Sequence, residues 1–81
     1  PDTLNTMQTL AASYLAIGKL KDARTLFEST LQLSKAKLGI DHPDTLNTMS
    51  NLATTYGKAG DFEQSLRMRQ ETLELQKNKL G

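Results

Sequence analysis

The chain has 81 residues, the size of one small domain. Ten Lys and Arg stand against nine Asp and Glu, and these charges are scattered, whereas nucleic-acid binding needs a clustered basic footprint. There is no cysteine, so disulfides and thiolate metal sites are excluded, and no apolar run approaches the roughly 18 residues of a membrane span.

The first predicted element is a helix over about residues 2–17. Its apolar residues recur at intervals of three and four, which places them on one face of a helix. These residues are Leu4, Met7, Leu10, Ala11 and Tyr14. Gly18 then ends the helix, because glycine is the usual residue just beyond a helix C-terminus.

The second predicted element is a helix over about residues 20–38. Lys19, which precedes it, is a poor N-cap. Its apolar residues fall on two faces, one with Phe27, Leu31 and Leu38 and the other with Leu26 and Leu33. A helix with two apolar faces is typical of a solenoid, in which each helix is packed between two neighbours.

A three-residue turn, 40–42, then leads into a second copy of the same unit. A shift of 42 positions aligns residues 1–39 with 43–81, and 18 of the 39 pairs are identical. The second unit is therefore predicted to hold helices over about 43–59 and 62–80. The sequence predicts an all-α fold: an α-solenoid fragment of two helix-turn-helix repeats, with four antiparallel helices.

The starts of the helices in the second unit carry capping residues. His42 stands before Pro43, which disfavours the α conformation at His42 and suits it to the N-cap. Asp61 precedes the last helix, and Gln64 three residues later completes a capping-box pattern. Lys19, at the equivalent position in the first unit, is a poor N-cap, so the helix that follows it is expected to fray more at its start.

The residue spacing resembles the tetratricopeptide repeat (TPR), whose pattern is W-x2-L-G-x2-Y, then A-x3-F. Met7, Leu10, Ala11 and Tyr14 occupy the first four places, and Ala23 and Phe27 the last two. The DHPD opening and the LG ending are similar to the 42-residue variant in kinesin light chains and nephrocystin-like proteins. The resemblance implies right-handed superhelical stacking and a non-catalytic protein–protein interaction scaffold.

The chain departs from the TPR pattern in two ways. Its unit is longer than the usual TPR of about 34 residues, and Lys35 and Lys77 replace the family proline, so the second helix of each unit is expected to hold most of the added length. In the second unit Ser65 and Arg69 stand where the first has Ala23 and Phe27. Weaker packing of the second unit is therefore expected.

The resemblance further implies that the first helix of each unit, its A helix, lines a concave face that binds peptides or partner helices. A helical wheel places ten residues opposite the apolar stripe. They are Asn5, Gln8, Thr9, Ala12 and Ala16 in the first unit and Asn47, Ser50, Asn51, Thr54 and Lys58 in the second. Asparagine can donate and accept hydrogen bonds to a peptide backbone. A solvated polar face has the same composition, so both interpretations stay open. A carboxylate clamp, in which Lys and Arg side chains bind the carboxylates of a peptide, is disfavoured because Lys58 is the only basic residue among these ten.

No constellation for catalysis stands out in the sequence. His42 is the only histidine, and with Asp41 and Asp44 it makes a weak metal spacing, so the helix-capping role is preferred. Catalysis needs a positioned set of groups, and we expect no enzyme activity, no cofactor and no metal. The expected partners are proteins or peptides, not nucleic acid or membrane, and the expected location is cytoplasmic.

The two ends of the chain suggest a second possibility. Natural solenoids end in capping elements with a polar outer face, but this chain begins at Pro1 and stops at Gly81 on a repeat boundary. We therefore expect a piece of a longer or designed array with uncovered ends. The residues expected there are Leu4 and Tyr14 at one end and Met68, Leu75 and Leu80 at the other. Copies of such a fragment could stack head to tail, and a structural repeat without a dedicated ligand is the alternative to an interaction module.

Overall fold

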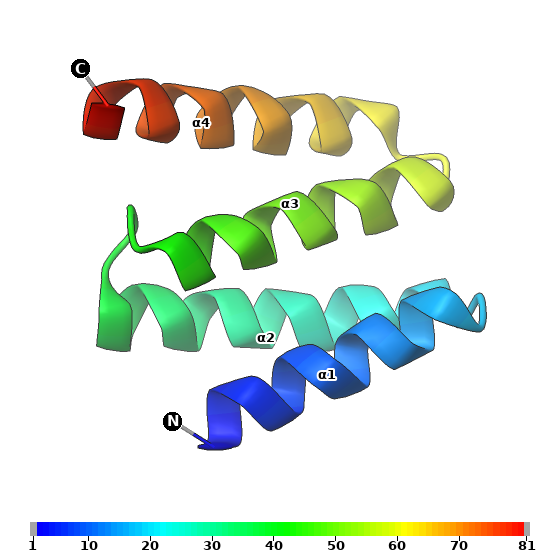
Figure 1. Cartoon of the computed structure of the whole chain (residues 1–81). Helices are drawn as coiled ribbons and strands as arrows, with labels where there is room; N and C mark the ends of the chain where they lie inside the picture. Colours follow the sequence, from blue (N-terminus) through cyan, green and yellow to red (C-terminus); the bar gives the residue numbers. More distant parts are fainter. Residues whose placement is uncertain (1, 81) are drawn as a thin grey trace.

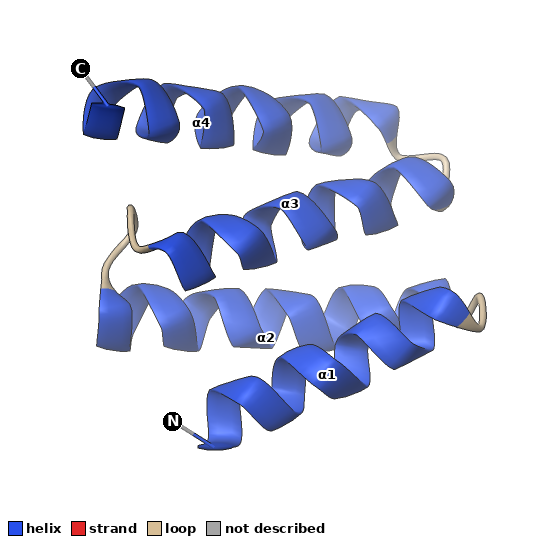
Figure 2. Cartoon of the chain, in the orientation of Figure 1, coloured by secondary structure: helices blue, strands red, loops and turns tan. Residues whose placement is uncertain are grey.

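The computed structural model describes the backbone from Asp2 to Leu80 and the side chains of residues 3–79. It consists of four helices: α1 (Asp2–Ala16), α2 (Leu20–Leu38), α3 (Pro43–Lys58) and α4 (Phe62–Leu80). Successive helices run antiparallel and are joined by short loops, and no strand occurs in this range (Figures 1 and 2). The all-α, two-repeat solenoid predicted from the sequence is confirmed.

Glycine in a left-handed conformation closes the hairpin within each repeat. Gly18 has φ of 82° and Gly60 has φ of 88°, a region that costs glycine little. The backbone N–H of the next residue then donates to a carbonyl five residues back, from Lys19 to Tyr14 at 2.9 Å and from Asp61 to Tyr56 at 2.9 Å. This Schellman arrangement satisfies the last carbonyls of one helix and lets the next begin almost at once.

The predicted helix caps are present in the second repeat. The backbone N–H of Asp44 donates to His42 Nδ1 at 3.1 Å, and the N–H of Gln64 donates to Asp61 Oδ1 at 3.4 Å. Lys19 makes no capping hydrogen bond through its side chain. The capping role of His42 is therefore confirmed.

The core lies along α3, which packs on α2 on one side and on α4 on the other (Figure 1). Helix α1 packs on α2 and makes only a marginal contact with α3. The buried apolar cluster draws on all of the first three helices: Ala11, Ala23, Phe27, Leu31, Leu46, Met49, Leu52 and Tyr56. Phe27 and Met49 are fully enclosed, so these two side chains hold the repeats together from within.

The second repeat is packed more closely than its sequence suggests. Ser65 is buried, and its Oγ donates to the carbonyl oxygen of Ala53 at 2.8 Å. Opposite it stands Gly57, where an added Cβ would lie 3.4 Å from Ser65 Oγ. The expectation of weak packing at Ser65 is wrong because its small side chain fits against Gly57 and gains a hydrogen bond. Arg69, by contrast, is exposed.

Two hydroxyl groups are buried without a hydrogen-bond partner among the described residues, Ser34 Oγ and Thr45 Oγ1. An unsatisfied buried hydroxyl costs free energy, and an apolar group of the same shape removes that cost. We expect Thr45→Val to raise the free energy of unfolding by about 1 kcal/mol in urea titrations. The matched control is Thr48→Val, which removes a hydroxyl that donates to the Asp44 carbonyl at 3.0 Å and should give no such gain. Equal stabilisation by both changes would contradict the role of the unpaired hydroxyl.

Candidate functional site: the outward faces of the A helices

The residues predicted to line a concave face lie on the solvent-facing sides of the two A helices, α1 and α3. Most are exposed, and Gln8, Asn51 and Thr54 are half-buried. The side-chain amides of Asn47 and Asn51 make no hydrogen bond to other residues of the described range, whereas Thr54 Oγ1 donates to the Ser50 carbonyl at 3.1 Å. The amides therefore retain their full hydrogen-bonding capacity for a partner.

Four of these ten residues border two hollows. A shallow hollow of about 400 Å³ on α1 is lined by Asn5, Thr6, Thr9, Leu10 and Ser13. A second hollow, of about 250 Å³, lies between α3 and α4 and is lined by Pro43, Leu46, Asn47, Ser50, Gln76 and Lys79. The first hollow lies on the α1 half of the predicted set and the second on the α3 half.

The basic residues around the α3 half were only partly foreseen. Ser50 also borders a hollow with Arg69, Thr72, Leu73 and Gln76 of α4. Lys79 reaches the same region, and its Nζ donates to the carbonyl of Asp41 at 3.0 Å. Lys58 is thus not the only cation near this surface, because the hairpin brings side chains from α4 alongside α3.

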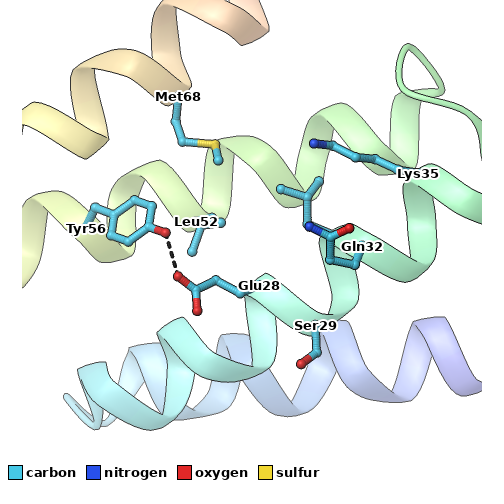
Figure 3. A pocket seen from close by; sticks show the side chains of 8 residues that line it. Glu28, Ser29, Gln32, Lys35, Leu52, Tyr56 and Met68 are labelled. Carbon is cyan, nitrogen blue, oxygen red and sulfur yellow. Dashed lines mark hydrogen bonds between the residues drawn. The ribbon is translucent and has the colours of Figure 1, made fainter.

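A further hollow lies on another face of α3 and was not predicted from the sequence (Figure 3). It measures about 430 Å³, and its lining comes from three helices: Glu28, Ser29, Leu31, Gln32 and Lys35 of α2, Leu52 and Tyr56 of α3, and Met68 of α4. Across it Tyr56 donates its hydroxyl hydrogen to Glu28 Oε2 at 2.7 Å. The 42-residue period could not reveal this pair, because the residue equivalent to Glu28 is Gln70.

The pKa of Tyr56, which lines this hollow, is strongly raised. Burial, and then the hydrogen bond to the Glu28 carboxylate and its negative charge, raise the pKa of Tyr56 to about 12. The phenol therefore stays a neutral donor at physiological pH. The arrangement ties α2 to α3.

The described residues form neither a metal-ligand cluster nor a membrane-spanning helix. Between residues 3 and 79 no three His, Asp or Glu side chains gather in a way suited to a metal ion. None of the four helices, over the described residues, has an apolar stretch long enough to cross a membrane.

The apolar residues expected at the uncovered ends lie elsewhere in part. Leu4 is only 8% exposed, so its expected exposure is wrong. Tyr14, Met68 and Leu75 are half-buried against the core cluster, and the Leu80 side chain lies outside the described residues. The large apolar side chains that are exposed on the first and last helices are instead Leu10 on α1, Ile17 just after it, and Phe62, Leu66 and Leu73 on α4.

Comparisons with known proteins agree with this architecture. The model of the tetratricopeptide repeat family matches residues 2–78. A search of curated proteins gives no match. Two crystal structures of the nearly identical TPR-like repeats of a kinesin light chain candidate from Podosopora anserina are similar in fold. One, a variant with a single substitution, has a TM-score of 0.86 and 24% identity over 99% of this chain, and the other has 0.84 and 24% over 98%.

Those similarities concern the fold alone, since the identity is low. This chain spans only 38% and 37% of the length of the two solved chains. The family model, however, covers residues 2–78, which is nearly the whole chain. The chain belongs to the tetratricopeptide repeat family.

Proposed function

We propose that this chain is a non-catalytic scaffold that binds an extended peptide or partner helix on the outward faces of its A helices. TPR repeats in general mediate protein–protein interaction. The observation that carries the proposal is the pair of uncommitted amides, Asn47 and Asn51, one turn apart on α3. Amides one turn apart can pair with successive groups of a peptide backbone.

The surface proposed to bind comprises nine residues. On α1 these are Asn5, Gln8, Thr9 and Ala12, and on α3 they are Asn47, Ser50, Asn51, Thr54 and Lys58. Arg69 borders Ser50 in one hollow, and Lys79 borders Asn47 in another. These cations favour a peptide that carries an acidic side chain beside its backbone contacts.

Peptide-library selection followed by calorimetry tests the proposal. We expect an enriched motif that contains Asp or Glu, and at least a tenfold loss of affinity on Asn47→Ala or Asn51→Ala, which is about 1.4 kcal/mol. Gln64→Ala is the matched control, because Gln64 is an exposed amide on α4 that lines neither hollow beside α3. Absence of any enriched motif, or equal affinity of all three variants, would contradict the proposal.

The proposal also includes the other expectations from the sequence. These are that the protein has no enzyme activity, has no nucleic-acid or membrane partner, and is located in the cytoplasm. Fluorescence microscopy of the tagged protein in its own cells checks the last of these.

A further inference from the structure

Two exposed stripes, one on the first helix and one on the last, are the outer faces of the molecule. The α1 outer face is made of Thr6, Leu10, Ser13 and Ile17. The α4 outer face is made of Leu66, Arg69, Leu73 and Gln76. All eight residues are exposed, and the leucines and Ile17 expose between 45% and 68% of their surface. Each stripe follows one side of its helix, since its members are three or four residues apart.

Both outer faces have a buried counterpart inside the molecule. Forty-two residues after the α1 outer face come Thr48, Leu52, Thr55 and Ala59, and the first three of these are at most 1% exposed. Forty-two residues before the α4 outer face come Arg24, Phe27, Leu31 and Ser34, and the last three are buried. These counterparts belong to α3 and α2, which pack against each other (Figure 1). The two outer faces therefore correspond to the two sides of the α2–α3 interface, and neither is covered by another helix among the described residues.

Three neighbouring pairs fix how the inner interface is aligned. Leu31 and Leu52 line one hollow, Arg24 and Ala59 line another, and Tyr56 donates to Glu28. A shift of 42 residues turns these into three pairs between the outer faces. The pairs are Leu73 with Leu10, Leu66 with Ile17, and Gln70 with Tyr14.

The substitutions within these pairs match each other. Arg24 beside Ala59 becomes Leu66 beside Ile17, so the charged member turns apolar and the small apolar member is a larger one. Gln70 replaces Glu28, and its amide oxygen can still accept the hydrogen bond of Tyr14. Arg69, which replaces Phe27, and Ser13, which stands where the second unit has Thr55, are polar members of the two stripes. No like charges face each other across the eight positions, and apolar residues meet apolar residues.

From this correspondence we infer that a second copy of the chain covers each outer face, with α1 of one copy packed on α4 of the next in the manner of α3 on α2. The contact is heterologous, because it joins two different faces. Such a contact leaves one free face of each kind on every complex, so assembly continues without closing as concentration rises. The two proposals are measured separately, because the amides of Asn47 and Asn51 lie outside both stripes, while Arg69 belongs to the α4 outer face and also borders Ser50.

The decisive experiment combines two blocked variants. One carries Leu10→Asp and Ile17→Asp, and the other carries Leu66→Asp and Leu73→Asp. Sedimentation equilibrium of the unmodified chain up to about 1 mM, where weak contacts are populated, should show a mass that rises with concentration. Each variant alone should stay monomeric, and an equimolar mixture should form a dimer and stop there, because only one intact face of each kind remains.

Controls separate this contact from general stickiness. Ile40→Asp changes an exposed apolar residue outside both stripes and should associate like the unmodified chain. The milder single changes Ile17→Ala and Leu66→Ala should leave the helices intact, which circular dichroism checks. Each should weaken association about tenfold through the lost methyl and methylene contacts. They keep the test valid if an aspartate variant does not fold.

Three outcomes would overturn the inference. The first is an unmodified chain that stays monomeric at about 1 mM. The second is a mixture of the blocked variants that stays monomeric while the unmodified chain associates. The third is self-association of either blocked variant alone, which would mean that a face pairs with itself. None of these outcomes bears on peptide selection, so the two proposals fail separately.

Discussion

Replacing Phe27 with alanine is expected to lower the free energy of unfolding by about 3–5 kcal/mol. Phe27 is fully buried in the core cluster, and its loss would leave a cavity between the repeats that the surrounding helices fill only in part. A domain of this length has a total stability of about 4–12 kcal/mol. The variant should therefore be largely unfolded well below the melting temperature of the unmodified chain.

The repeat itself supplies the control for this experiment. Arg69 occupies the equivalent position in α4 and is exposed, so Arg69→Ala should change stability by about 0.5 kcal/mol or less. Urea unfolding followed by circular dichroism measures both. Comparable losses from the two variants would mean that the two positions bear similar packing, against the burial seen here.

The second large effect concerns the pH dependence of stability through Tyr56. Its pKa rises from 10.0 to about 12 in the folded chain, so the folded state holds the phenol proton more tightly than the unfolded state. The resulting stabilisation is fully present below pH 10 and is lost as the pH rises toward 12. The loss amounts to about 2–3 kcal/mol.

Other groups also titrate in that range, so the contribution of Tyr56 is a difference between variants. The stability advantage of the unmodified chain over Tyr56→Phe should shrink between about pH 9 and about pH 11.5. A Tyr14→Phe background leaves Tyr56 as the only tyrosine, and its ionisation is then read from ultraviolet absorbance. A difference that stays constant with pH would mean that burial and the hydrogen bond to Glu28 do not raise the pKa of Tyr56 in the folded chain.

The sequence predicted most of the fold because its signals are local. The glycines at 18 and 60 set the hairpins, and His42 before Pro43 set the start of α3. The period of 42 residues identified the two units without any reference to tertiary contacts. Spacing of apolar residues within 20–38 also showed correctly that this helix is covered on two sides.

What the sequence did not predict depends on which helices lie next to each other. Leu73 repeats Leu31 of α2, yet Leu73 and its neighbour on the same face, Leu66, are exposed because no following helix covers them among the described residues. Leu4 could not be distinguished from Leu10 by spacing, although Leu4 is buried and Leu10 is exposed. The hydrogen bond from Tyr56 to Glu28 joins residues 28 positions apart, beyond the reach of any helical period.

The buried threonines of the solenoid have a bearing on how such arrays evolve. Thr30, Thr48 and Thr55 each donate to a carbonyl oxygen four residues earlier in their own helix. Their hydroxyls are thus satisfied before any neighbouring helix arrives, and they present only methyl groups and backbone to it. A neighbour needs no matching polar group at a set position. Gene duplication can then add units, and the copies can diverge, without simultaneous compensating mutations at every such contact.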